Sequence, residues 1–185
     1  VLLFQLVEKC KFKGAHHKDT VSHVCAAFAN MSKNERLFEH AAGILQMFRN
    51  VCKTMAVQRD EDTKQRILWT CFHLVMGLED KIVCIDTGIV DLIRLLSTDT
   101  IDANHQVCAA IICTLSKSRS CRAALLQAEA SDILMRIAGV TDNLVTTKHC
   151  AVGLCNLSSS MVVKPGQGKL LLDIGISVGV QKEDQ

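Results

Sequence analysis

A pattern that recurs about every 42 residues limits the possible folds of this 185-residue chain more than any other feature. Its first part is a stretch of small and apolar residues, such as Cys150-Ala-Val-Gly-Leu-Cys-Asn-Leu-Ser158. The four copies align on Asn30, Gly77, Thr114 and Asn156, which are 47, 37 and 42 residues apart. A second part follows each copy at Gly43, Gly88, Glu129 and Gly175, with spacings of 45, 41 and 46 residues. Because the spacings of the two aligned positions lengthen and shorten together, they indicate an internal repeat.

Composition and flanking residues favour helices within each repeat. The chain has one proline, no tyrosine and ten glycines, which suits helices better than many short strands. Asp and Thr residues precede the longest apolar segment of each copy, as helix N-caps do. We expect these long helices at about residues 20–31, 63–78, 101–115 and 143–157. Short helices are expected at 33–41, 80–86, 118–127 and 168–173, and further helices at 43–53, 88–97 and 130–138.

Both parts of the pattern resemble the armadillo repeat family. The stretch from Ala26 to Ser32 is similar to that family's ALxNLS helix, and Gly88 to Leu96 is the closest match to its GxIxxLxxLL segment. The chain departs from the family where a proline after Gly-x-Ile is absent, where Glu129 replaces a glycine, and where residues 158–168 resemble an insertion. The resemblance covers about residues 20–178 and implies an all-α fold, a right-handed α-α superhelix of stacked repeats.

A single armadillo-repeat region over residues 1–185 is therefore expected, with about four repeats. The expected units are 20–53, 63–97, 101–138 and 143–178, and residues 1–13 are expected to end a preceding repeat. Both ends of the sequence then cut through repeats, so we expect a longer array.

Charge and hydropathy exclude several classes of function. With 21 basic and 19 acidic residues the net charge is +2, which provides no overall field for nucleic acid or an anionic membrane. No apolar run approaches the roughly 20 residues of a transmembrane helix. We expect neither nucleic acid nor membrane as a partner.

Ten cysteines lie mostly inside apolar stretches, where they behave as small hydrophobic residues. No CxxC motif occurs, and the pairs His23 with Cys25 and His149 with Cys150 lack the spacing of a zinc finger. We expect buried free thiols, with disulfides or a metal site as the alternatives. Free thiols predict a reducing compartment, the cytoplasm or the nucleus.

No pattern of catalytic residues is recognisable. The run Ser158-Ser159-Ser160 lacks a GxSxG elbow, and Gly166-Gln167-Gly168-Lys169 lacks the first glycine and the Ser or Thr of a P-loop. The sequence therefore predicts a protein that is not an enzyme, with no cofactor, no metal and no small-molecule substrate.

The resemblance implies a protein–protein interaction scaffold that binds a peptide or a domain in a concave groove lined by the long helices. A helix turns about 100° per residue, which places Ile67, Leu68 and Cys71 on one side of the helix at 63–78 and Trp69 on the opposite side. The side with Trp69 is expected to line the groove, with Gly77 leaving room for a partner side chain. The predicted groove residues are Asn30, Arg66, Trp69, His73, Gly77, Gln106, Thr114, Lys148 and Asn156. The alternative is that Trp69 packs sideways against a neighbouring helix.

Two other functions remain open at this stage. The chain could be the regulatory region of a larger enzyme, or an import-adaptor-like cargo binder. Import adaptors of the importin-α type line their groove with a Trp-x-x-x-Asn ladder, and the matching pairs here retain Asn30 and Asn156 but no tryptophan. This departure predicts weak or no binding of basic import peptides.

Overall fold

The computed structural model describes residues 17–52, 60–98 and 100–158. The expected segments at 1–13 and 168–173, Cys10, Gly175 and the run Gly166 to Lys169 lie outside the described residues. Within these ranges every element is helical and none is a strand, which confirms the all-α prediction. None of these helices is both long enough and apolar enough to cross a lipid bilayer.

The long helices begin and end close to the predicted positions. They are α2 (His17–Met31), α5 (Glu61–Gly77), α8 (Asp102–Lys117) and α11 (Leu144–Ser158). The shorter elements are η1 (Glu35–His40), α3 (Ala41–Cys52), α6 (Ile82–Asp86), α7 (Ile89–Leu96), α9 (Arg119–Gln127) and α10 (Ala130–Val140). The predicted helix at 33–41 is a 3-10 helix, whose start is capped by the Asn34 carboxamide accepting from the Arg36 N–H at 3.0 Å.

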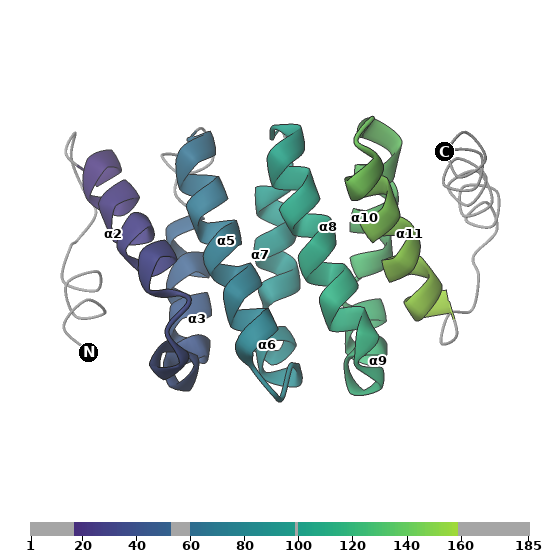
Figure 1. Cartoon of the computed structure of the whole chain (residues 1–185), viewed down its shortest axis with the longest axis horizontal. Helices are drawn as coiled ribbons and strands as arrows, with labels where there is room; N and C mark the ends of the chain where they lie inside the picture. The colour runs from purple at the N-terminus through teal and green to yellow at the C-terminus, as the bar shows by residue number, and fades with distance from the viewer. Residues whose placement is uncertain (1–16, 53–59, 99, 159–185) are drawn as a thin grey trace.

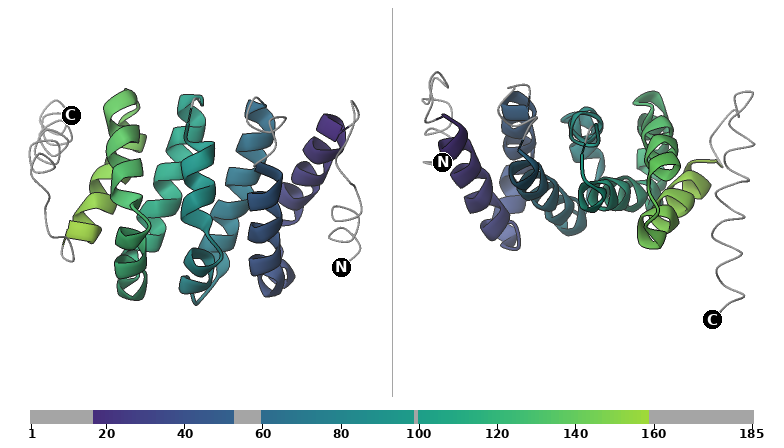
Figure 2. Two further views of the ribbon diagram at one scale, coloured as in Figure 1. Left: turned by 180° about the vertical axis from the view of Figure 1, so that it is seen from behind. Right: turned by 90° about the horizontal axis from the view of Figure 1, so that it is seen from above.

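The helices form two layers in an elongated molecule. Helices α2, α5, α8 and α11 lie side by side in chain order, and α3, α7 and α10 lie behind them (Figure 1). The view from above in Figure 2 shows the same two layers. Each long helix contacts the next one in sequence, α2 with α5, α5 with α8, and α8 with α11. The four long helices, α2, α5, α8 and α11, therefore form one long, open face along the molecule.

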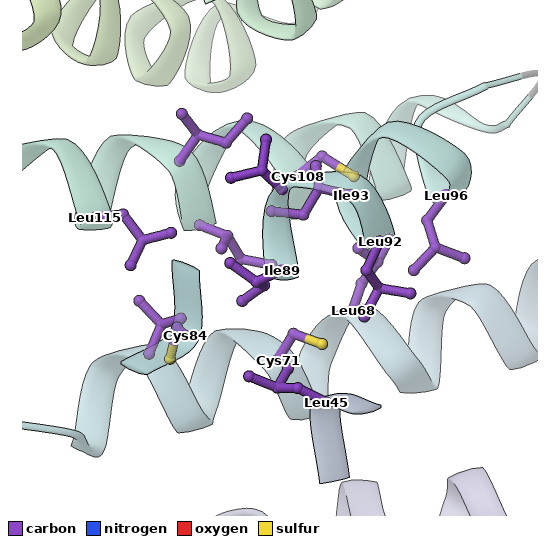
Figure 3. Packing of buried hydrophobic residues seen from close by; sticks show 14 of the residues in the cluster. Leu45, Leu68, Cys71, Cys84, Ile89, Leu92, Ile93, Leu96, Cys108 and Leu115 are labelled. Carbon is purple, nitrogen blue, oxygen red and sulfur yellow. The ribbon is translucent and has the colours of Figure 1, made fainter. Parts of the chain in front are cut away.

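One hydrophobic core lies between the two layers (Figure 3). Leu68 of α5 is fully buried there, as are Ile89 and Ile93 of α7. Cys71, Cys108 and Cys150 occupy equivalent positions of the predicted repeat, and all three are fully buried. Their small side chains let neighbouring helices approach closely.

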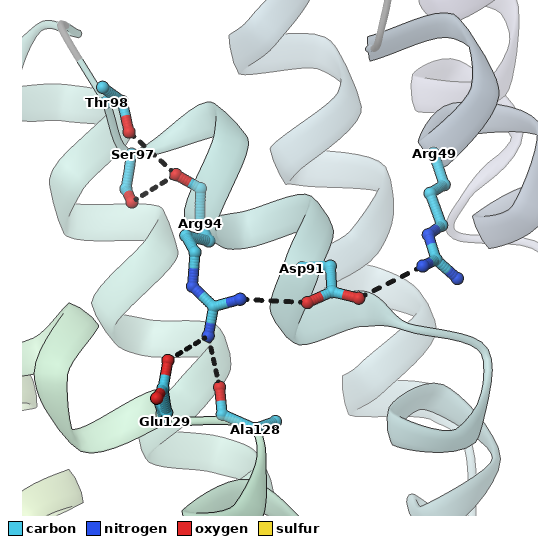
Figure 4. Close-up of polar contacts among 7 residues, drawn as sticks. All are labelled: Arg49, Asp91, Arg94, Ser97, Thr98, Ala128 and Glu129. Carbon is cyan, nitrogen blue, oxygen red and sulfur yellow. Dashed lines mark hydrogen bonds and ion pairs between the residues drawn. The ribbon is translucent and has the colours of Figure 1, made fainter.

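Ion pairs connect the helices of the second layer (Figure 4). The Arg49 guanidinium of α3 lies 3.3 Å from the Asp91 carboxylate of α7, and Arg94 of α7 lies 3.5 Å from Glu129 at the start of α10. Arg94 also donates to the carbonyl oxygen of Ala128 at 2.5 Å. Arg49 and Arg94 stand six residues after Gly43 and Gly88, so equivalent arginines join neighbouring helices, although Asp91 and Glu129 do not occupy equivalent positions.

Candidate functional site

Helix α5 has a buried side and an exposed side, divided as the sequence predicts. Ile67, Leu68 and Cys71 are fully buried, whereas the Trp69 side chain is 43% exposed on the opposite side. Trp69 packs edge-on against Phe72, with ring centroids 5.7 Å apart, and its ring lies 5.9 Å from that of His73. Both contacts are within α5, so much of the indole remains accessible.

A hollow of about 450 Å³ lies beside Trp69, between α2 and α5. Its lining residues are Ala29, Asn30, Lys33, Gln65, Arg66, Trp69 and His73. Four of the predicted groove residues, Asn30, Arg66, Trp69 and His73, therefore meet in one place. The side chains come from α5, from α2 and from the turn that follows α2.

Arg66 connects the two walls of the hollow. Its guanidinium donates to the hydroxyl of Ser22 on α2 at 2.8 Å and to the Ser22 carbonyl oxygen at 3.2 Å. These bonds hold the guanidinium at the edge of the hollow, where its orientation is set before any partner arrives.

His73 is held at the other end by Ser32. The Ser32 hydroxyl donates to the Ala29 carbonyl oxygen at 2.7 Å, and the imidazole Nδ1 lies 2.5 Å from the same hydroxyl oxygen. Because the single hydroxyl hydrogen goes to Ala29, Nδ1 must carry the proton and donate to Ser32. Burial lowers the pKa of His73 below its usual value, and the positive charge of Lys33 lowers it further. The ring is therefore neutral near pH 7.

Gly77 does not leave room for a partner, contrary to the prediction. A Cβ atom built on Gly77 would lie 1.9 Å from the Phe38 ring, so a side chain of η1 already occupies that space. The glycine is explained by close packing between α5 and η1 rather than by ligand binding.

The remaining predicted groove residues lie on α8 and α11 and do not line the hollow. Thr114 is only 9% exposed, because α8 is packed between its neighbours, so the prediction that it faces a partner is wrong. Asn156 donates to the Ser116 hydroxyl at 3.1 Å across the α8–α11 contact. Gln106 is half-buried and Lys148 is exposed.

Sequence reasoning missed Lys33 and Gln65 in the lining and Ser22 and Ser32 behind it. Ser22 stands eight residues before Asn30, as Trp69 stands eight before Gly77, so the repeat alignment already paired the two positions. Lys33 follows Asn30 by three residues and lies in the turn just after the end of α2. The bonds of the two serines could not be read from spacing, because they depend on how far apart α2 and α5 lie.

The described side chains at the hollow that could take part in chemistry are few. The Ser32–His73 pair is the one nucleophile–base contact at the hollow, and Ser32 is fully buried, out of reach of a substrate. Among the described residues no group of three or more His, Cys, Asp or Glu side chains is placed to hold a metal ion. Burial raises the pKa of the Cys25, Cys84 and Cys150 thiols to about 12, which keeps them in the unreactive thiol form.

No protein-family model matches the chain, and no curated protein sequence matches it.

Proposed function

We propose that this chain is an armadillo-type solenoid that binds an extended segment of a partner protein against the face formed by α2, α5, α8 and α11. The observation that carries the proposal is the hollow between α2 and α5, with the 43%-exposed indole of Trp69 in its wall. An accessible tryptophan next to an arginine is the composition that dominates binding energy at protein interfaces.

The order of contacts supports the solenoid. Each long helix contacts its neighbours in chain order, as stacked repeats require. Gly88 and Glu129 begin the helices α7 and α10 in the left-handed conformation, with φ of 84° and 57°, at equivalent positions. A right-handed superhelix of stacked repeats predicts that such a conformation recurs at the same position of each repeat. The proposed repeat units are 20–53, 63–97, 101–138 and 143–178.

The architecture also supports peptide binding as the function of this face. A layer of parallel long helices offers a broad, shallow surface, whereas enzymes commonly need a deep pocket with converging reactive groups. The bonds from Arg66 to Ser22 and from His73 to Ser32 fix two polar side chains of the hollow in advance. A prearranged surface loses less entropy when it binds a flexible segment.

Peptide selection followed by substitution tests the proposal. Peptides are selected from a random displayed library on the 185-residue chain, and their affinities are measured by calorimetry. Trp69→Ala should weaken binding by about 2 kcal/mol, roughly 30-fold, without changing the helical circular dichroism. The matched control is Leu95→Ala, which removes a partly exposed apolar side chain from α7 in the other layer and should change affinity less than about twofold. Loss of folding in Trp69→Ala, with unchanged affinity per folded molecule, would instead identify Trp69 as a packing residue.

A further inference from the structure

The hollow between α2 and α5 carries two cationic side chains and no carboxylate among its lining residues. Lys33 is exposed, and its ammonium group has no hydrogen bond or ion pair within the part of the chain that the structure describes. Arg66 donates to Ser22, which is uncharged, so this contact leaves the guanidinium charge unbalanced. Asp62, on the same side of α5 and four residues before Arg66, does not line the hollow. An anionic ligand would therefore meet two positive charges here.

Trp69 lies between the two charges along α5. Arg66 precedes Trp69 by three residues, and His73 follows it by four. Lys33 lies at the His73 end, because it follows Ser32, whose hydroxyl is 2.5 Å from the His73 ring nitrogen. At 1.5 Å per residue, Arg66 and His73 are about 10 Å apart along the helix. The exposed indole is thus flanked by one cation on each side.

We infer that this hollow binds an extended acidic segment in which an apolar side chain is flanked, two positions away on each side, by Glu or Asp. The inference rests on the proposed function and specifies the chemistry of its partner. Alternate residues of an extended chain face the same side, and residues four apart lie about 13 Å from each other. The long side chains of Lys33 and Arg66 span the difference of about 3 Å from the helix spacing. The apolar side chain lies on the indole of Trp69, and the two carboxylates contact the two cations.

Fluorescence anisotropy with synthetic peptides tests the pattern. The probe carries Glu-Ser-Phe-Ser-Glu between neutral Gly-Ser flanks, and the comparison peptides replace both Glu by Gln, both Glu by Lys, both Glu by phosphoserine, or Phe by Ser. Replacing both Glu by Gln should weaken binding about 30-fold, and replacing Phe by Ser about tenfold. Equal binding of the Gln peptide, tighter binding of the Lys peptide, or binding of the phosphoserine peptide alone overturns the inference.

Two charge reversals test whether Lys33 is the contact. Lys33→Glu should weaken binding of the Glu probe at least about tenfold. Arg119→Glu makes the same change in net charge at an exposed position on α9 away from the hollow, and it should change binding less than about twofold. Replacing one particular Glu of the probe by Lys should restore binding to Lys33→Glu, and replacing the other should not. If the two variants weaken binding equally, the attraction is a general charge effect and the inference fails.

The library selection separates failure of the inference from failure of the proposed function. Selected peptides that lack acidic residues but lose binding in Trp69→Ala would overturn the acidic pattern and leave peptide binding in place. If no peptide is selected and the Glu probe does not bind, both are wrong. Enrichment of acidic residues around an apolar position, lost in Lys33→Glu, supports both.

Discussion

The side chain of Lys64 is only 2% exposed, and its ammonium group lies 2.8 Å from the Glu61 carboxylate. Lys64 stands on the buried side of α5, where a charge is costly unless it is paired. The same carboxylate accepts from the Thr100 hydroxyl at 2.5 Å and from the Asn104 carboxamide at 2.8 Å, both from the following part of the chain. One partly exposed carboxylate thus stabilises a buried cation and joins α5 to the start of α8.

Glu61→Gln should lower the free energy of unfolding by about 2–3 kcal/mol, because it removes the carboxylate charge that pairs with the buried ammonium group of Lys64. Urea unfolding followed by circular dichroism measures the loss. Asp62→Asn removes the neighbouring, exposed carboxylate and should cost no more than about 0.5 kcal/mol. Equal losses of unfolding free energy in the two variants would show that the Glu61–Lys64 ion pair does not stabilise the fold.

The same contacts predict how stability depends on pH. Burial opposes ionisation of Glu61, but hydrogen bonds from Lys64, Thr100 and the Ile101 N–H outweigh it and lower its pKa below the usual 4.5. The folded state therefore binds this proton less tightly than the unfolded state does. The contribution of Glu61 is complete above pH 4.5 and is lost as the pH falls through the lowered pKa. Below pH 4.5, Glu61→Gln should lose less stability with acidification than the parent chain.

Glu129 is the one described residue other than glycine with a positive φ, 57°. A left-handed conformation costs a residue with a Cβ atom about 1 kcal/mol, a cost that glycine does not have. Its ion pair with Arg94 contributes little, because the Glu129 side chain is 65% exposed. Glu129→Gly should therefore raise the free energy of unfolding by about 0.5–1 kcal/mol in urea titrations, whereas Glu129→Gln should not raise it.

At the scale of the elements, the contact between η1 and α5 depends on a missing side chain. The Phe38 ring of η1 lies where a Cβ atom on Gly77 would be. Gly139 in α10 provides a comparison, because a Cβ atom there would have no neighbour within 4 Å. Two glycines in helices thus differ only in what surrounds them.

Gly77→Ala should destabilise the chain by about 1 kcal/mol because the Phe38 ring must move, and Gly139→Ala should stabilise it by about 0.5–1 kcal/mol through helix propensity. Thermal unfolding of both variants measures the difference. In a Phe38→Ala background the penalty of Gly77→Ala should disappear. A penalty that persists there would place its cause in the backbone of α5.

Across the whole molecule, most of the described cysteine side chains lie in the core rather than at the surface. Of the nine described cysteines, all of them free, eight are buried and Cys155 on α11 is exposed. Burial raises the pKa of Cys52, Cys71 and Cys108 well above the usual 9.0. Their distribution along the stacked helices makes thiol reactivity a measure of the global fold.

Among the nine described cysteines, brief treatment of the native chain with N-ethylmaleimide should therefore modify Cys155 first, and the eight buried thiols should react only in urea. Peptide mass spectrometry identifies the modified positions. Rapid modification of Cys71 or Cys108 in the native chain would mean that the helices separate readily and that the stacked core is not closed.

The amino-acid pattern by itself determined the helices, their order and the buried side of α5. Apolar spacing along a helix is a local property, so α5 and its buried Ile67 and Cys71 could be predicted, and so could the exposure of Trp69. The equivalence of Ser22 and Trp69 was likewise present in the repeat alignment.

Only the tertiary structure decided which side chains meet across neighbouring helices. The bond between Ser32 and His73 joins residues 41 positions apart, and the Arg66–Ser22 bond joins residues 44 apart. Such contacts depend on the distance and angle between helices, which a helical period does not contain. For the same reason the sequence predicts open space at Gly77, whereas the ring of Phe38 occupies that space.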